Sequence, residues 1–317
     1  MPISPKRIKP GNRVAIVAPS SPFNPLELQE GLDLISSLGL IPVLGPNVKN
    51  LHVKSMHSAS VDLRVQELMW AFTAPDISAV ICAVGGFGCA ELLPYLDYKK
   101  IAKSRRVFIS MSDGTALNNG ILNKSGLINF NAQTPSIRLD KGKSIYQSDS
   151  ESLIHVLRLC MSSNKWDDSP FDNNRILTRT INSGISSGIA IGGNLDTFTN
   201  LLATEFIPPP TGSILFIEDV HKGATTIARM LLHLKLSGFL SNLNGIVVGE
   251  FTDVPQKKDE RESSIEDVLL EYLDGNIPVV YGMSFSHGPY TSPIPIGATT
   301  LLDASNGTVK FDFCLGE

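Results

Sequence analysis

Short apolar runs alternate with amphipathic helical segments through the first half of this chain. The pattern predicts a short helix near Leu92, helices over 24–39 and 60–72, and strands over 13–18, 41–44, 77–83 and 107–111. Ile77 to Ala83 is apolar except for Ser78, which is typical of a strand that helices cover on both faces. The alternation therefore indicates a parallel sheet between helices, the arrangement of an α/β domain.

A polar, turn-rich stretch separates this half from a second set of elements. A helix over 148–161 is followed by residues 162–174, which are rich in Ser, Asp and Asn. Beyond it the sequence predicts a helix over 227–236, a hairpin around Asn306-Gly307, and strands over 213–217, 245–251 and 279–283. We therefore expect an N-terminal domain over 1–161, a linker over 162–180 and a C-terminal domain over 181–317.

Length, charge and composition exclude several classes of protein. With 317 residues, 42% of them hydrophobic, the chain can bury two domain cores. A net charge of −4 and scattered Lys and Arg give no basic surface for nucleic acid. The apolar runs are strand-length and the first residues lack the core of a secretory signal, so we expect no membrane span and a cytoplasmic protein. The cysteines and histidines show no metal-type spacing, so we expect free thiols and neither a metal nor another cofactor.

Three separated stretches supply the side chains of a serine hydrolase. Ser112 comes just after the apolar run 107–109 and precedes a helical pattern, as a nucleophile at a strand-to-helix turn would. Glu218 and Asp219 follow another apolar run, and His287 lies in a turn-rich segment. A nucleophile, a base and an acid that orients the base are the minimum for acyl transfer, so the three stretches predict a catalytic triad.

Each of these signals has an alternative interpretation. Ser112 or Asp113 would also serve as an ordinary cap of the helix that follows. The glycine-rich stretch 85–88 fits a phosphate loop, a donor of a backbone amide to an oxyanion, or only a tight turn. Other candidate bases are His52, His57, His155, His221 and His233.

Taken together and in order, these stretches resemble the LD-carboxypeptidase family, which includes murein tetrapeptide carboxypeptidases and microcin C immunity proteins. The resemblance covers nearly the whole chain and rests on residues 10–21, 84–88, 112–113, 192–195, 215–219, 229–231 and 287–288. It implies a flavodoxin-like N-terminal domain, similar to class I glutamine amidotransferases, and a β-rich α+β C-terminal domain. Members are usually homodimers, and the same is expected here.

The resemblance also assigns roles to individual residues. It implies Ser112 as the nucleophile, His287 as the base and Glu218 as the acid that orients the base. The oxyanion hole is expected from the backbone amides of Gly86 and Asp113. Asp219, on the opposite face of its strand, is then expected to cap or brace the loop that follows, through Val220 and Lys222.

The chain departs from the family pattern at five positions. Val84 stands where the family usually has arginine, and Phe87 where it has tyrosine. Met111 replaces an aromatic residue, Ser110 replaces a common glycine, and Gly114 stands where a bulkier residue is usual. Val84 cannot hold a substrate carboxylate as an arginine would, so these departures bear on the substrate rather than on the hydrolase assignment.

The expected activity is release of the terminal D-alanine from a cytoplasmic murein tetrapeptide, through an acyl-enzyme and without a metal. The substrate is a small peptide, with contacts expected from Gly85 and Trp166. Trp166 and Phe171 would cover the cleft or, alternatively, pack the linker against a core. One rival function is an immunity-type amidase that cleaves a peptidyl or aminoacyl adenylate analogue, and it needs an aromatic residue to stack on the base. The other is a peptide-binding protein without turnover.

Overall fold

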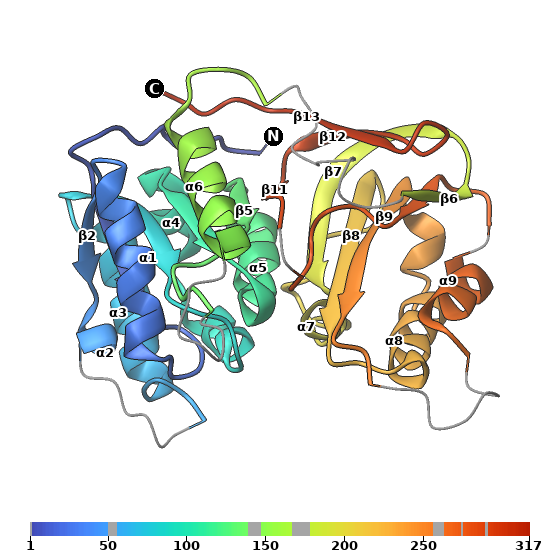
Figure 1. Ribbon diagram of the computed structural model, residues 1–317, viewed down its shortest axis with the longest axis horizontal. Coiled ribbons are helices and arrows are strands. Elements are labelled where there is room, and N and C mark those ends of the chain that lie inside the picture. Colours follow the sequence, from blue (N-terminus) through green and yellow to red (C-terminus); the bar gives the residue numbers. More distant parts are fainter. Residues whose placement is uncertain are drawn as a thin grey trace.

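The computed structural model contains two lobes, each built around its own sheet (Figure 1). It describes residues 2–49, 56–138, 147–166, 178–255, 263–273, 275–288 and 291–317. Most of the expected linker, 167–177, and with it Phe171, lies outside the described residues. The first lobe holds the N-terminal half of the chain, in blue and green, and the second holds the C-terminal half, in yellow to red.

The first sheet has the strand order of a flavodoxin-like fold. Its parallel strands are β1 (Arg13–Val17), β2 (Ile41–Leu44), β3 (Ile77–Cys82), β4 (Val107–Ser110) and β5 (Asn129–Asn131). They run in the order β2-β1-β3-β4-β5, and β11 (Ile294–Ile296) pairs antiparallel with β5 at the edge. This 2-1-3-4-5 order confirms the expected fold.

Helices cover both faces of this sheet, as the apolar run of β3 requires. One face packs against α1 (Pro25–Ser37) and α6 (Gln147–Met161). The other packs against α3 (Val61–Thr73), α4 (Tyr98–Ser104), α5 (Thr115–Ser125) and the 3₁₀ segment η1 (Cys89–Tyr95). The helix starts follow the sequence signals, since Asn24 caps the Leu26 amide of α1 and Ser60 caps the Leu63 amide of α3. The short α2 (Pro46–Lys49) follows β2.

The second sheet is parallel in its centre and antiparallel at both edges. Its strands are β6 (Arg179–Asn182), β7 (Ile185–Asn194), β8 (Ser213–Val220), β9 (Gly245–Thr252), β10 (Val279–Tyr281), β12 (Thr299–Asp303) and β13 (Thr308–Asp312), in the order β13-β12-β7-β8-β9-β10-β6. Strands β7 to β10 are mutually parallel, and the β12–β13 hairpin forms around Asn306-Gly307 as expected. The helical elements of this lobe are α7 (Leu195–Thr199), α8 (Ala224–Leu236), η3 (Leu240–Asn242) and α9 (Ile265–Leu273).

The two lobes are joined by more than one stretch of chain. Strand β11 belongs to the expected C-terminal domain but completes the first sheet. The C-terminal end also returns to the first lobe, where Gly316 accepts a hydrogen bond from the Arg7 amide (Figure 1). Between the sheets, the Asn119 side chain on α5 exchanges two hydrogen bonds with the backbone of Gly192 on β7. The helix that follows Ser112 is therefore fixed directly to the second sheet.

The thiols follow the sequence expectation. Cys82, Cys89 and Cys160 are free and buried, and Cys314 is free and exposed. Among the described residues, no helix is long and apolar enough to cross a membrane.

Candidate active site

A pocket lies where the carboxyl ends of both sets of parallel strands meet. Its volume is about 370 Å³, which suits a small ligand. The described residues that line it are Ser21, Pro22, Val84, Gly85, Gly86, Met111, Ser112, Gln133, Thr134, Ser136, Arg138, Val220, His221, Asp253, His287 and Gly288. The segments after β1, β3, β4 and β5 form one wall, and those after β8, β9 and β10 form the other. Loops at this edge of a parallel sheet are the usual place for a ligand.

Ser112 lies on a tight turn between β4 and α5, with a backbone φ of 60°. A residue with a Cβ seldom adopts this left-handed conformation, which costs about 1–3 kcal/mol and is concentrated at functional sites. The neighbouring glycines make room for the turn. A Cβ at Gly85 would lie 2.6 Å from the Ser112 Cβ, and a Cβ at Gly114 would lie 2.5 Å from the Ser110 Cβ. Ser110 and Gly114, two of the departures from the family pattern, therefore fit each other.

The capping interpretation of this turn is wrong. Neither η2 (Ser112–Gly114) nor α5 has a side-chain cap, since their N-cap residues are Met111 and Gly114. The Asp113 carboxylate points elsewhere, and its Oδ2 accepts hydrogen bonds from the Ser20 hydroxyl at 2.5 Å and the Cys89 amide at 2.9 Å. These bonds connect the turn after β4 to the segments after β1 and β3. The neighbouring segments therefore fix the backbone around Ser112.

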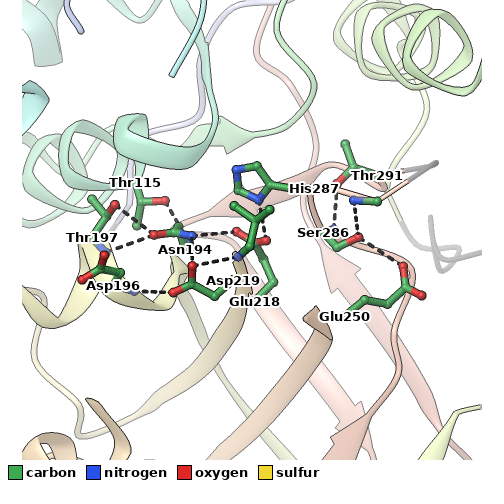
Figure 2. Close-up of polar contacts among 12 residues, drawn as sticks. Thr115, Asn194, Asp196, Thr197, Glu218, Asp219, Glu250, Ser286, His287 and Thr291 are labelled. Atoms are coloured by element: carbon green, nitrogen blue, oxygen red, sulfur yellow. Dashed lines mark hydrogen bonds and ion pairs between the residues drawn. The ribbon is translucent and has the colours of Figure 1, made fainter. Parts of the chain in front are cut away.

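His287 is paired with Glu218 across the second sheet. The His287 Nδ1 lies 2.7 Å from Glu218 Oε2, and the Glu218 side chain is only 2% exposed (Figure 2). An ionised carboxylate can only accept a hydrogen bond, so we assign the ring hydrogen to Nδ1. Nε2 is then the basic nitrogen. It is buried and, among the described residues, has no hydrogen-bond partner.

Asp219 faces away from His287 and holds the backbone beside it. Its Oδ1 accepts from the Val220 amide at 2.8 Å and from Asn194 Nδ2 at 3.1 Å, and its Oδ2 accepts from the Asp196 amide at 2.9 Å (Figure 2). Asn194 also reaches Glu218 Oε1 at 3.5 Å, since the two residues are paired in the register of β7 against β8. Asp219 thus braces the end of β8 through Val220, as expected, and also the start of α7, whereas Lys222 pairs with Asp196 instead.

The surroundings of His287 set its basicity. Burial alone lowers the pKa of the imidazole, but the charge and hydrogen bond of Glu218, aided by the charge of Asp219, outweigh it. The net result is a His287 pKa above its ordinary value. Burial also raises the pKa of Asp219, with a smaller contribution from the charge of Glu218.

The structure brings together most of the residues singled out in the sequence. Ser112, Gly85, Gly86 and His287 line one pocket, with Glu218 behind the histidine. Among the described residues, no hydrogen bond joins Ser112 to His287, since Nε2 is unpartnered. Hydrogen bonds between catalytic groups are often long without substrate and tighten only in its presence.

Trp166 lies away from this pocket. Its side chain is 4% exposed and packs against Phe130 and Phe313, with ring centroids 5.3 and 5.7 Å away. It does not line the pocket and instead fills the core of the first lobe.

Of the other histidines, only His221 is among the residues that line the pocket, and His52 lies outside the described residues. His57 lies 3.5 Å from Glu91, while His155 and His233 are on α6 and α8. Within the described ranges, no group of three or more His, Cys, Asp or Glu residues is placed to hold a metal ion.

The sequence assigned no role to two polar residues of this site, although Asn194 lies in one of the stretches that carry the family resemblance. Arg138 contacts the backbone of His287, and Asn194 contacts both Glu218 and Asp219. Arg138 follows the three-residue strand β5, which the sequence pattern does not predict. No local pattern therefore marks Arg138 as a site residue. Asn194 follows two glycines whose φ values of 107° and 130° put them in a conformation that other residues rarely adopt. This glycine pair is the local sequence signal that could have drawn attention to Asn194.

Comparison with known proteins identifies the family of the chain. The family model of the LD-carboxypeptidase N-terminal domain matches residues 14–132, and that of the LD-carboxypeptidase C-terminal domain matches residues 187–302. The chain belongs to the LD-carboxypeptidase family. The two matches place Ser112 in the family's N-terminal domain, and Glu218 and His287 in its C-terminal domain.

Individual members of the LD-carboxypeptidase family resemble the chain over nearly its full length. A probable murein peptide carboxypeptidase of Bacillus subtilis is 30% identical over 99% of this chain and 95% of its own. The structure of the microcin C7 self-immunity protein MccF in complex with aspartyl sulfamoyl adenosine is 27% identical, with a TM-score of 0.83 over 99% of this chain and all of that one. A muramoyltetrapeptide carboxypeptidase from Oxalobacter formigenes is 25% identical, with a TM-score of 0.79 over 96% of this chain and all of that one.

Proposed function

We propose that this protein is a metal-independent serine carboxypeptidase that removes the terminal D-alanine from murein tetrapeptide. The observation that carries the proposal is one pocket lined by a serine on a strained turn and by a histidine paired with a buried glutamate. Membership of the LD-carboxypeptidase family supports a carboxypeptidase activity, and relatives named for murein peptides support the substrate.

In this mechanism His287 is the general base. Its Nε2 takes the proton of the Ser112 hydroxyl as the oxygen attacks the carbonyl carbon of the scissile bond. Glu218 holds the ring in the tautomer with the hydrogen on Nδ1 and stabilises the imidazolium that forms. His287 then gives the proton to the leaving amine of D-alanine, and water hydrolyses the acyl-enzyme on Ser112 with His287 again as base.

The backbone amides of Gly86 and Asp113 are the proposed oxyanion hole. Gly86 has a φ of 117° and lines the pocket, and Asp113 directly follows the nucleophile. The hydrogen bonds from Ser20 and Cys89 to the Asp113 carboxylate fix the peptide unit that would donate. Pre-positioned donors of this kind stabilise charge that develops only in the transition state.

A second candidate is an amidase that acts on aminoacyl adenylate analogues. The structural likeness to MccF in complex with aspartyl sulfamoyl adenosine favours it. Such a ligand needs a surface on which its base stacks. Trp166, the proposed stacking residue, is in the core, and among the described residues the pocket wall has no Phe, Tyr or Trp. The geometry therefore supports the murein peptide better.

Turnover of two substrates by the purified protein separates these functions. We expect release of D-alanine from murein tetrapeptide, and little or no hydrolysis of an aminoacyl sulfamoyl adenosine. The reverse preference would establish the amidase. Absence of turnover on both, with binding of the tetrapeptide by calorimetry, would establish a peptide-binding protein without catalysis.

The proposed setting is the cytoplasm, where the product tripeptide re-enters peptidoglycan recycling, and the proposed assembly is a homodimer. Light scattering of the purified protein tests the assembly, and cell fractionation tests the location. A monomer at micromolar concentration, or a protein recovered from the medium, would contradict these two proposals.

A further inference from the structure

We propose that Arg138 is a positioning residue that holds the base His287 in register with the lobe that carries Ser112. This inference rests on the proposed catalytic roles of Ser112 and His287 and adds a residue to which none has been assigned. His287 belongs to the second lobe, while Arg138 follows β5 of the first lobe and lines the same pocket. A single side chain therefore crosses from the lobe of the nucleophile to the loop of the base.

The contacts of Arg138 are made to the backbone of that loop. Its Nη1 donates to the His287 carbonyl oxygen at 2.9 Å, and its Nη2 donates to the Gly288 carbonyl oxygen at 2.9 Å. The planar fork of a guanidinium can bridge two adjacent carbonyls in this way, whereas an ammonium group cannot reproduce the geometry. The bridge fixes the peptide units on both sides of Gly288, and thus the direction of the His287 side chain.

A buried carboxylate fixes the guanidinium in turn. Asp149, in the first turn of α6, is 1% exposed, and it accepts from Arg138 Nε at 2.9 Å and Nη2 at 2.6 Å. One turn further along α6, the Ser152 hydroxyl accepts a hydrogen bond from the Thr291 amide at 3.0 Å. Thr291 follows His287 and Gly288 in the chain, so this bond supports the far side of the same loop. Helix α6 of the first lobe thus supports the loop at two points.

The second lobe holds the same loop from its own side. The Ser286 hydroxyl donates to Glu250 at 3.2 Å and accepts from the Gly288 amide at 2.9 Å, and the Ser286 amide donates to the Thr291 hydroxyl at 3.1 Å (Figure 2). The bond to Glu250 comes from β9, in the sheet that also carries Glu218, and the other two bonds lie within the loop and fix its shape. The contacts from Arg138 and Ser152 relate the loop to the lobe of Ser112, as does the pairing of β11 with β5 that follows the loop.

The charge of Arg138 gives its role a distinctive signature. The charged and titratable groups around His287 among the described residues are Glu218 and Asp219 on β8, His221 and Asp253 at the ends of β8 and β9, Glu250 on β9, and Arg138. The positive charge of Arg138 opposes protonation of the imidazole and lowers its pKa, against the carboxylates, which raise it. Loss of this charge must therefore move the His287 pKa further upward.

Three variants test the proposal: Arg138→Met, Arg138→Lys, and Arg158→Met as a control that removes an exposed arginine from α6. We expect Arg138→Met to lower kcat by about tenfold to a hundredfold, the usual cost of a slightly misplaced catalytic group, with KM changed less than about twofold. In Arg138→Met, the acid limb of the pH profile of kcat/KM should move to higher pH. Arg138→Lys should keep the acid limb but lose most of the kcat, because it retains the charge without the fork. Arg158→Met should match the wild type.

A titration of His287 by NMR, assigned with a His287→Gln variant, measures the same change without turnover. Since Arg138→Met leaves Asp149 buried without its partner, Asp149→Asn serves as a second variant that loosens the guanidinium and keeps its charge. An unchanged His287 pKa in Arg138→Met, or a KM effect with unchanged kcat in Arg138→Lys, would overturn the positioning role in favour of substrate binding. Failure of the proposed function shows separately, as turnover that survives Ser112→Ala or His287→Gln.

Discussion

Glu218→Gln should nearly abolish turnover while the protein stays folded. In the structure, Glu218 Oε2 accepts from His287 Nδ1 at 2.7 Å, in a site where the carboxylate is 2% exposed. Glutamine has almost the same shape, but it offers either an oxygen or an NH₂ group and no negative charge. The tautomer and the imidazolium both lose their support, and kcat should fall about 10³–10⁴-fold with KM nearly unchanged.

The pH profile of the same variant provides the second measurement. The charge of Glu218 is the largest of the influences that raise the His287 pKa, so its loss lowers that pKa. The base must be neutral to accept a proton. Wild-type kcat/KM should therefore fall as the pH drops through a value above 6.5, and in Glu218→Gln this limb should move to lower pH. Because the pKa is raised on folding, the stability from this pair is full below pH 6.5 and is lost as the pH rises through the folded-state pKa.

Asp219→Asn is the matched control, since it removes the neighbouring carboxylate. Asp219 accepts hydrogen bonds from Asn194, Val220 and Asp196, and an asparagine can accept with only one of its two side-chain atoms. We expect a loss of about 1–2 kcal/mol in the free energy of unfolding and activity within about tenfold of the wild type. The assignment of Glu218 is refuted if Asp219→Asn loses turnover and Glu218→Gln remains active, with both melting as folded proteins.

Three further predictions concern the turn, the core and metals. Gly85→Ala should lower kcat by about a hundredfold or more, because the new Cβ would lie 2.6 Å from the Ser112 Cβ and displace it. Normal kinetics in this variant would count against the close approach of Gly85 to the Ser112 turn. Trp166→Ala should lower the free energy of unfolding by about 3–5 kcal/mol, since the side chain is buried against Phe130 and Phe313. The KM for tetrapeptide should stay constant. A raised KM in a stable variant would indicate instead that Trp166 contacts the substrate. Treatment with a chelator should leave activity intact, and loss of activity that zinc restores would place the protein in another mechanistic class.

The fold of the first lobe was accessible from the sequence because its signals are local. Strands such as 77–83 are almost entirely apolar, and Asn24 and Ser60 mark helix starts by hydrogen bonds that span only a few residues. Strands β5 and β11 have three residues each, contain asparagine or proline, and were not predicted, whereas the equally short β10 lies within the predicted strand 279–283. The expected domain boundary likewise could not include β11, because its pairing with β5 joins residues that are far apart in the chain.

The second sheet shows the same limit. Strand β7, the longest strand of the structure's described residues, contains several glycines and serines and lacks the apolar pattern of a buried strand. It forms because β8 and β12 pair with it on either side, which is a tertiary cause. The Asn306-Gly307 hairpin was predicted correctly because turn geometry is encoded in the two turn residues themselves.

The site divides in the same way. Ser112, Glu218 and His287 were singled out because a strand end, a carboxylate and a loop histidine can each be recognised locally and then matched to a family pattern. Arg138 acts through two carbonyl oxygens contributed by residues about 150 positions away. Trp166 was expected to contact the substrate but lies in the core. An aromatic residue in a polar stretch can serve either purpose, and only the packing against Phe130 and Phe313 decides between the two.

The proposed role of Ser112 is best tested by measuring release of D-alanine from murein tetrapeptide by Ser112→Ala. Ser112 combines the strained backbone, the place in the pocket and the nearby base that define the proposed nucleophile. We predict a kcat lower by several orders of magnitude, an unchanged melting temperature, and no acylated species by mass spectrometry after rapid quenching. Near-wild-type release of D-alanine by a folded Ser112→Ala variant would contradict the serine hydrolase mechanism.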